Sequence, residues 1–241
     1  MEGLKGRVET LADSAALARR AAEWMTAAAL ASQDAFRVSL SGGSTPKALF
    51  TLLASDDFVG RFPWRRVNWY WGDERFVPYD HPDSNYGMTR KAMLSRAPVP
   101  PENIHPVPVD GDPEQAAARY EQTLQAAYGA PSLDPARPLF DVTLLGLGPD
   151  GHTASLLPGE PVLQERRRWV APVAHGRPEV RITMTYPAIE SSRHVAFLVS
   201  GSAKADILRT MRGGGSDVPA ARVRPHGELI WFVDRAAWSE G

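Results

Sequence analysis

Apolar positions along the chain change repeatedly between two kinds of pattern. From residue 8 to residue 31 they recur at spacings of three and four, which predicts an amphipathic helix. Short runs rich in β-branched and aromatic residues predict strands at 36–40, 67–71, 140–145, 169–173, 194–199 and 229–233. Helical spacing returns between them, at 46–54, 85–95, 113–128 and 203–212. The sequence therefore predicts strands and helices in alternation.

The predicted strands are almost continuously apolar, which is typical of parallel strands that are covered on both faces. Alternation with helices favours the same sheet. The chain has no internal repeat, and its Pro- and Gly-rich stretches are too short to mark a boundary between domains. We expect one α/β domain over residues 1–241, built on a doubly wound, mostly parallel sheet with helices on both faces.

The composition of the chain argues against several classes of function. The chain has 241 residues, 43% hydrophobic and 23% charged, with a net charge of −1 and no long basic block that would suit a nucleic acid. It has no Cys, which excludes disulfides and thiolate chemistry, and its His residues lack metal-ligand spacing, so we expect no metal. No signal segment begins it and no run of eighteen apolar residues interrupts it, so we expect a cytoplasmic protein away from membranes.

The first candidate for chemistry is SGGSTPK at 41–47, directly after the strand at 36–40. Ligands of open α/β sheets bind beyond the carboxyl ends of strands. Gly42 and Gly43 let the backbone approach a ligand, and the free N–H groups of the following helix favour an anion. Thr45 is the expected N-cap, with Pro46 at the first helical position. A structural turn with a good cap explains the same residues equally well.

The second candidate is Asp73-Glu74-Arg75, after the strand at 67–71. Charged residues at the end of a strand either line a site or pair in a surface loop, and the loop is the more common outcome. Ser84 and Asn85 downstream are expected to cap the next helix.

The third candidate is GLGPDGHTAS at 146–155, after the strand at 140–145. The spacing of its glycines matches a dinucleotide-binding fingerprint, which requires a long helix after the glycines and an acidic residue at the end of the next strand. Here Pro158 and Gly159 would end such a helix, and the strand at 169–173 contains no Asp or Glu. The match to the fingerprint is therefore coincidental. What remains is Asp150 two residues before His152. A histidine suits a general base near neutral pH, and a carboxylate can orient it. The alternative is a histidine that caps the turn.

These three segments, with VSGSAK at 199–204 as a fourth block in the same order, resemble the 6-phosphogluconolactonases of the glucosamine-6-phosphate isomerase/6-phosphogluconolactonase family. The resemblance implies a fold of modified Rossmann type. It also implies hydrolysis of 6-phospho-D-glucono-1,5-lactone, in the oxidative pentose phosphate pathway, without a cofactor. We expect a monomer or small homo-oligomer whose partner is a small sugar phosphate.

The resemblance also assigns roles to residues. For the phosphate it implies a cradle of backbone N–H groups and two cations: Gly42, Gly43, Ser44 and Thr45, with Arg181 and Lys204. His152 would deprotonate water, Asp150 or Asp73 would support its imidazole, and Arg75 would steady the oxyanion or the sugar hydroxyls.

Two other functions stay open. A deaminase or isomerase acting on an amino-sugar phosphate would use the same cradle, but its motif resembles Asp-Gly-His-x-Ala-x-Asn-Glu-Pro, and here Leu156 and Leu157 replace the Asn and the Glu. A non-catalytic sugar-phosphate sensor would not need Asp150 and His152. The lactonase is the favoured reading.

Overall fold

The computed structural model describes residues 4–214 and 216–239, so both ends of the predicted 1–241 domain lie outside it. Seven strands form the larger sheet, in which every neighbouring pair is parallel. In spatial order they are β1 (Arg7–Leu11), β10 (Glu228–Asp234), β9 (Ser192–Val199), β6 (Phe140–Leu145), β2 (Phe36–Leu40), β3 (Val67–Trp71) and β5 (Ile104–His105).

The order of these strands contains one change of direction. From β2 the chain adds β3 and β5 on one side, and then returns to place β6 on the other side of β2, followed by β9 and β10. This is the doubly wound order of nucleotide-binding folds, with β1 added at the edge beside β10. The predicted fold class is confirmed, and the switch point lies between β2 and β6.

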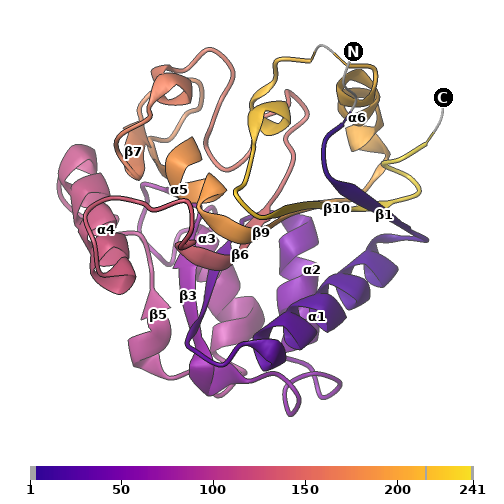
Figure 1. The fold of residues 1–241 in the computed structure, drawn as a ribbon, viewed down its shortest axis with the longest axis horizontal. Helices are drawn as coiled ribbons and strands as arrows, with labels where there is room; N and C mark the ends of the chain where they lie inside the picture. Colours follow the sequence, from indigo (N-terminus) through magenta and orange to yellow (C-terminus); the bar gives the residue numbers. More distant parts are fainter. Residues whose placement is uncertain (1–3, 215, 240–241) are drawn as a thin grey trace.

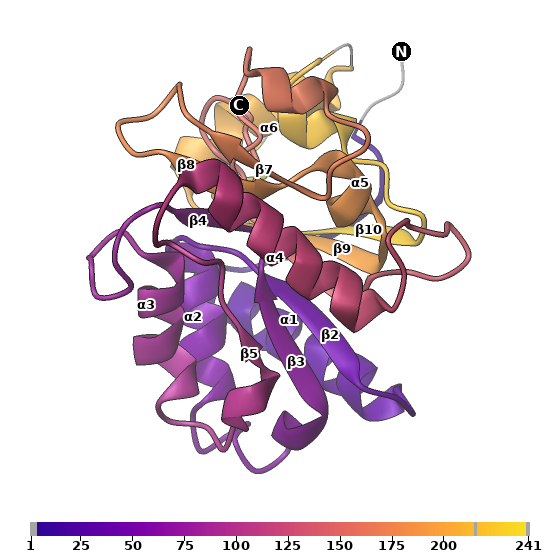
Figure 2. The same ribbon diagram turned by 90° about the vertical axis from the view of Figure 1, so that its left-hand side faces the viewer.

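Helices cover both faces of the sheet (Figures 1 and 2). α1 (Ser14–Ala31) and α2 (Ser44–Leu53) pack together on one face, and α5 (Tyr186–Glu190) and α6 (Ala205–Arg212) lie on the other. α3 (Asn85–Thr89) continues into a π-helical turn, Arg90–Leu94. α4 (Pro113–Tyr128) is joined to the sheet by Tyr120, whose hydroxyl exchanges hydrogen bonds with the backbone of Trp71.

A second, antiparallel sheet corrects two expectations. It consists of β4 (Asp73–Arg75), β8 (Arg181–Met184) and β7 (Val170–Val173), in the order β4-β8-β7. The strand predicted at 169–173 therefore exists, but it lies outside the parallel sheet. Residues 73–75, expected as a loop, form a strand because they pair with β8, and a three-residue strand is too short to reveal a period.

The start of the chain corrects another expectation. The helix predicted over 8–31 begins only at Ser14, and the preceding segment is strand β1, which pairs with β10. Asp13 marks the boundary, because its carboxylate accepts the N–H of Ala16 at 2.8 Å. Apolar residues recur at the same spacing through β1 and α1, so the spacing alone does not reveal the N-cap at Asp13.

Replacement of the cap tests this boundary. Asp13→Ala is expected to lower the free energy of unfolding by about 1 kcal/mol, because the N–H of Ala16 loses its acceptor. Asp13→Asn is the control, since its amide oxygen can accept the same bond. Urea denaturation followed by circular dichroism measures the free energy of unfolding of both variants. An equal loss of that free energy in the two would contradict the capping role.

Candidate active site

A cavity of about 200 Å³ opens at the carboxyl ends of β2 and β6, beside the switch point. It brings together the three segments singled out in the sequence and two cations from further along the chain. The lining residues are Ser41, Gly42, Gly43, Asp73, Arg75, Asn85, Gly146, Leu147, Gly148, Pro149, His152, Thr153, Ala154, Arg181 and Lys204. Ser44, Thr45 and Asp150, also predicted, are not part of this lining.

Two glycines allow the walls of the cavity to approach each other. A Cβ on Gly42 would lie 1.9 Å from Oδ1 of Asn85, and a Cβ on Gly148 would lie 2.0 Å from Nδ1 of His152. Real Cβ atoms do not approach so closely, so any other residue would displace the facing side chain. Gly42 and Gly148 are therefore required because a neighbouring side chain occupies the space that a Cβ would fill. Gly43 is required because its backbone φ is 103°, a conformation that other residues rarely adopt.

His152 and Asp150 form a close pair. Nδ1 of the imidazole lies 2.5 Å from Oδ1 of Asp150, and the backbone N–H of His152 donates to the same oxygen at 3.2 Å. The other ring nitrogen, Nε2, has no hydrogen-bond partner among the described residues, while His152 lines the cavity. An imidazole held at one nitrogen and open at the other is suited to proton transfer.

Asp150 has a second partner that the sequence did not reveal. Nη2 of Arg177 donates to Oδ2 of Asp150 at 2.6 Å. Burial acts to raise the pKa of Asp150, but the hydrogen bonds from Arg177 and His152 outweigh it and hold that pKa well below its usual range. The carboxylate is therefore ionised and shared between two donors. Arg177 stands in the loop between β7 and β8, where no motif marked it.

Asp73 and Glu74, adjacent in the sequence, have different surroundings. Asp73 lines the cavity, where it accepts a hydrogen bond from Ser155 Oγ at 2.7 Å and one from Asn85 Nδ2 at 3.4 Å. None of the hydrogen bonds of the described residues joins it to His152, which is instead bonded to Asp150. Asn85, expected only as part of a helix start, is thus also a residue of the site.

Glu74 is fully buried and holds the start of α3. Its carboxylate accepts the backbone N–H groups of Arg75 at 2.9 Å, Asn85 at 2.7 Å and Tyr86 at 2.8 Å, and the hydroxyl of Ser84 at 3.1 Å. Burial raises the pKa of Glu74 and these backbone donors lower it, with burial the larger effect. Ser84 in turn accepts the N–H of Gly87, which confirms it as the N-cap.

Arg75 and Arg181 face each other across the pairing of β4 with β8. The Nε atoms of both are buried and have no hydrogen-bond partner among the described residues. Arg75 donates from Nη1 to the carbonyl of Asp83 at 2.5 Å, and burial lowers the pKa of Arg181. The positive charge of two adjacent guanidinium groups in the lining suits an anionic or hydroxylated ligand in the cavity.

The start of α2 differs from the expected capped turn. The N-cap is Gly43 rather than Thr45, and no side chain bonds to the first N–H groups of the helix. Thr45 is occupied elsewhere, because its hydroxyl lies 2.9 Å from that of Ser200 after β9. Ser44 is exposed. Lys204 lines the same cavity, and burial lowers its pKa while Asp150 acts in the opposite direction.

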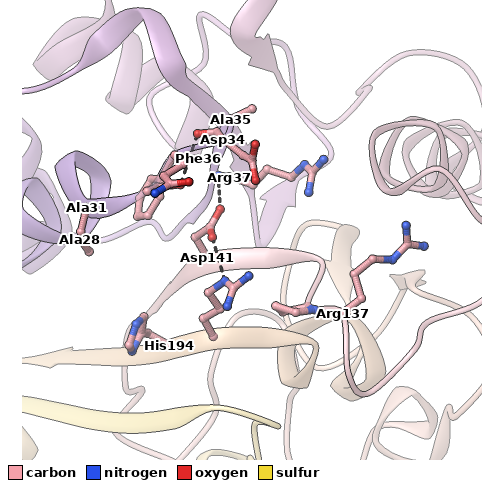
Figure 3. A pocket seen from close by; sticks show the side chains of 13 residues that line it. Ala28, Ala31, Asp34, Ala35, Phe36, Arg37, Arg137, Asp141 and His194 are labelled. Carbon is pink, nitrogen blue, oxygen red and sulfur yellow. Dashed lines mark hydrogen bonds and ion pairs between the residues drawn. The ribbon is translucent and has the colours of Figure 1, made fainter.

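A larger cavity, of about 600 Å³, lies at the opposite, amino-terminal edge of the sheet (Figure 3). None of the predicted site residues lines it. Asp141, which lies at its centre in the view, accepts the backbone N–H of Arg37 at 2.8 Å and Nε of Arg193 at 3.2 Å. Its carboxylate is thus already paired, and the site predicted from the sequence belongs to the smaller cavity.

The described residues offer neither a metal site nor a membrane-spanning helix. Among residues 4–214 and 216–239, no group of three or more His, Cys, Asp or Glu side chains is arranged to hold a metal ion. Over that same part of the chain, every helix is too short or too polar to cross a membrane.

The fold and the cavity define a class: doubly wound α/β proteins that hold a small ligand at the switch point of the sheet. Residues 12–231 match the family model of glucosamine-6-phosphate isomerases/6-phosphogluconolactonase. The chain belongs to this family.

Its relatives include the 6-phosphogluconolactonase of Nostoc sp., 42% identical over 98% of this chain and 99% of the relative, and that of Homo sapiens, 37% identical over 92% and 87%. The solved structure of 6-phosphogluconolactonase from Trypanosoma cruzi matches with a TM-score of 0.84 and 28% identity, over 98% of this chain and 97% of that one. A monomeric glucosamine-6-phosphate deaminase shares the fold, with a TM-score of 0.80 at 22% identity over 96% and 98% of the two chains.

Replacement of Glu74 tests its structural role. Glu74→Gln is expected to lower the free energy of unfolding by about 1–3 kcal/mol, because the new NH₂ group would face an N–H or hydroxyl donor. Glu114→Gln, at an exposed ion pair with Arg168, is the matched control and should cost less than about 1 kcal/mol. Chemical denaturation measures both variants. Equal stability of Glu74→Gln and the wild type would show that the buried carboxylate is not needed.

Proposed function

We propose that this chain is a 6-phosphogluconolactonase that hydrolyses 6-phospho-D-glucono-1,5-lactone to 6-phospho-D-gluconate in the cytoplasm, without a metal or cofactor. One observation carries the proposal. The imidazole of His152 is bonded to Asp150 within a cavity whose lining also holds two arginines with unsatisfied Nε atoms. A base and a set of cationic donors within one cavity suit a phosphorylated ester. The lactonases among the relatives support the same substrate.

The phosphate has a place at the start of α2. Gly43 leaves the first turn of the helix without a side-chain cap, and the free N–H groups there attract an anion. Arg181 and Lys204 line the same cavity and would supply charge-assisted hydrogen bonds to the phosphate oxygens. Ser44 and Thr45 would contribute through their backbone, since the hydroxyl of Thr45 is bonded to Ser200.

The reaction needs a base and a group that stabilises negative charge. Nε2 of His152 would take a proton from water as its oxygen attacks the C1 carbonyl of the lactone. Asp150, bonded at Nδ1, orients the ring and stabilises the imidazolium. Arg75 would donate to the oxyanion that forms on the carbonyl oxygen. When the bond from C1 to the ring oxygen breaks, the imidazolium returns the proton to that oxygen.

The structure disfavours the two alternatives. Leu156 and Leu157, which replace the Asn and Glu of the deaminase-type motif, are 0% and 1% exposed, so they pack in the core and transfer no proton. A sensor would bind the phosphate without needing a base, yet Asp150 holds His152 in the cavity at 2.5 Å.

An assay of the two enzyme activities tests the proposed function. The protein is expected to accelerate the loss of 6-phosphogluconolactone at slightly acidic pH, where spontaneous hydrolysis is slow, and to release no detectable ammonia from glucosamine 6-phosphate. Ammonia release at a rate comparable with lactone hydrolysis would contradict the proposal. Binding of the lactone without turnover would favour the sensor.

The role of His152 has its own test. His152→Ala is expected to lower kcat by about 10²- to 10⁴-fold, the usual worth of a general base, with little change in substrate affinity. His226→Ala, at an exposed histidine outside the cavity, is the control and should retain wild-type turnover. Near wild-type kcat in His152→Ala would exclude the residue as the base.

Removal of Arg181 separates phosphate binding from chemistry. Arg181→Ala is expected to raise KM for the phosphorylated lactone about ten- to hundredfold, the worth of one charge-assisted hydrogen bond, with a smaller effect on kcat. Gluconolactone without the phosphate should be a poor substrate and should be hydrolysed at similar rates by variant and wild type. If the variant lost both substrates equally, Arg181 would not be a phosphate contact.

A further inference from the structure

Arg177 lies in the loop that joins β7 to β8, and its guanidinium reaches back to the His–Asp pair. Nη2 donates to Oδ2 of Asp150 at 2.6 Å, while Nη1 donates to the carbonyl of Gly176 at 2.8 Å. Asp150 thus divides its two oxygens between two donors, with Oδ1 toward His152 and Oδ2 toward Arg177. Nη2 also lies only 3.3 Å from Nδ1 of His152.

We propose that Arg177 is a positioning residue that fixes the Asp150 carboxylate against His152 and sets the lower pH limit at which His152 works as a base. The kinetic part of this inference rests on the proposed lactonase function. Arg177 does not line the cavity and so acts through Asp150 and His152 rather than through the substrate.

Both oxygens of Asp150 are held. Oδ1 lies against Nδ1 and the backbone N–H of His152, and Oδ2 accepts Nη2 of Arg177. The charge-assisted bond at Oδ2 fixes the plane of the carboxylate, while the backbone N–H keeps Oδ1 beside the imidazole with or without Arg177. The pair is also better shielded than the ion pair of Arg119 with Asp110: Arg177 and Asp150 are 31% and 36% exposed, whereas Arg119 and Asp110 are 42% and 84% exposed.

The charge of Arg177 also acts on the imidazole of His152. Asp150 favours the protonated imidazole, and the positive charge of Arg177 disfavours it because like charges repel. The remaining charged groups of the cavity are Asp73, Arg75, Arg181 and Lys204. Removal of the Arg177 charge therefore makes the imidazole easier to protonate. The neutral base then persists only at higher pH.

Three variants test this inference. For Arg177→Met, the acid limb of the pH profile of kcat/KM is expected to move to higher pH by about 0.5–1 pH unit, because a like charge beside the imidazole is lost. Arg177→Lys restores the charge and should move the limb back toward the wild type. Arg119→Met removes the arginine of the exposed pair with Asp110, outside the cavity, and should leave the profile unchanged.

A measurement without substrate separates this inference from the proposed function. The chemical-shift titration of the His152 imidazole, followed by NMR and assigned with His152→Ala, should move to higher pH in Arg177→Met even if the lactone is not the substrate. An unmoved titration together with an unmoved acid limb would overturn the inference and leave an ordinary ion pair. A raised KM with an unmoved acid limb would also overturn it, and would make Arg177 a substrate contact.

Discussion

The site depends on one topological constraint, the change of direction between β2 and β6. Because the chain leaves these two parallel strands toward opposite faces of the sheet, no crossover covers the edge between their carboxyl ends. The turns after β2 and β6 both open into that gap. Gly42 and Gly148 then let the turns approach Asn85 and His152 more closely than any Cβ would permit. The cavity, the position of His152 beside it and the uncapped start of α2 are consequences of this arrangement.

The three charged residues of β4 differ in whether they reach the cavity. Glu74, fully buried, is surrounded by donors at the start of α3, whereas its neighbours in the sequence, Asp73 and Arg75, reach the cavity. The three residues separate because 73–75 form a strand whose side chains alternate. On the second sheet, the pairing of Arg75 with Arg181 places two cations side by side, with Glu179 3.8 Å from Arg181 as an acidic partner.

Most of the parallel sheet was predictable because its strands are buried on both faces and read as unbroken apolar runs. The second sheet was not, since β4 has three residues and β7 and β8 gain their partners only through long-range pairing. The candidate site shows the same division. Gly42, Asp150 and His152 stand in motifs, and their adjacency to strand ends predicted a common edge. Arg177 carries no local signal, because it sits in a loop. Asn85 accompanies the motif at 72–75, but it resembles an ordinary helix start and only that role is expected of it. The N-cap was misassigned to Thr45, because the sequence cannot reveal the competing bond to Ser200.

A structure of the protein with bound 6-phosphogluconate tests whether one ligand spans the edge between β2 and β6. We expect the phosphate against the backbone of Gly43, with Arg181 and Lys204 as its cationic partners. We also expect the C1 carboxylate within hydrogen-bond reach of Nε2 of His152. A phosphate bound beside His152, or a ligand in the cavity at the amino-terminal edge that contains Asp141, would contradict this arrangement.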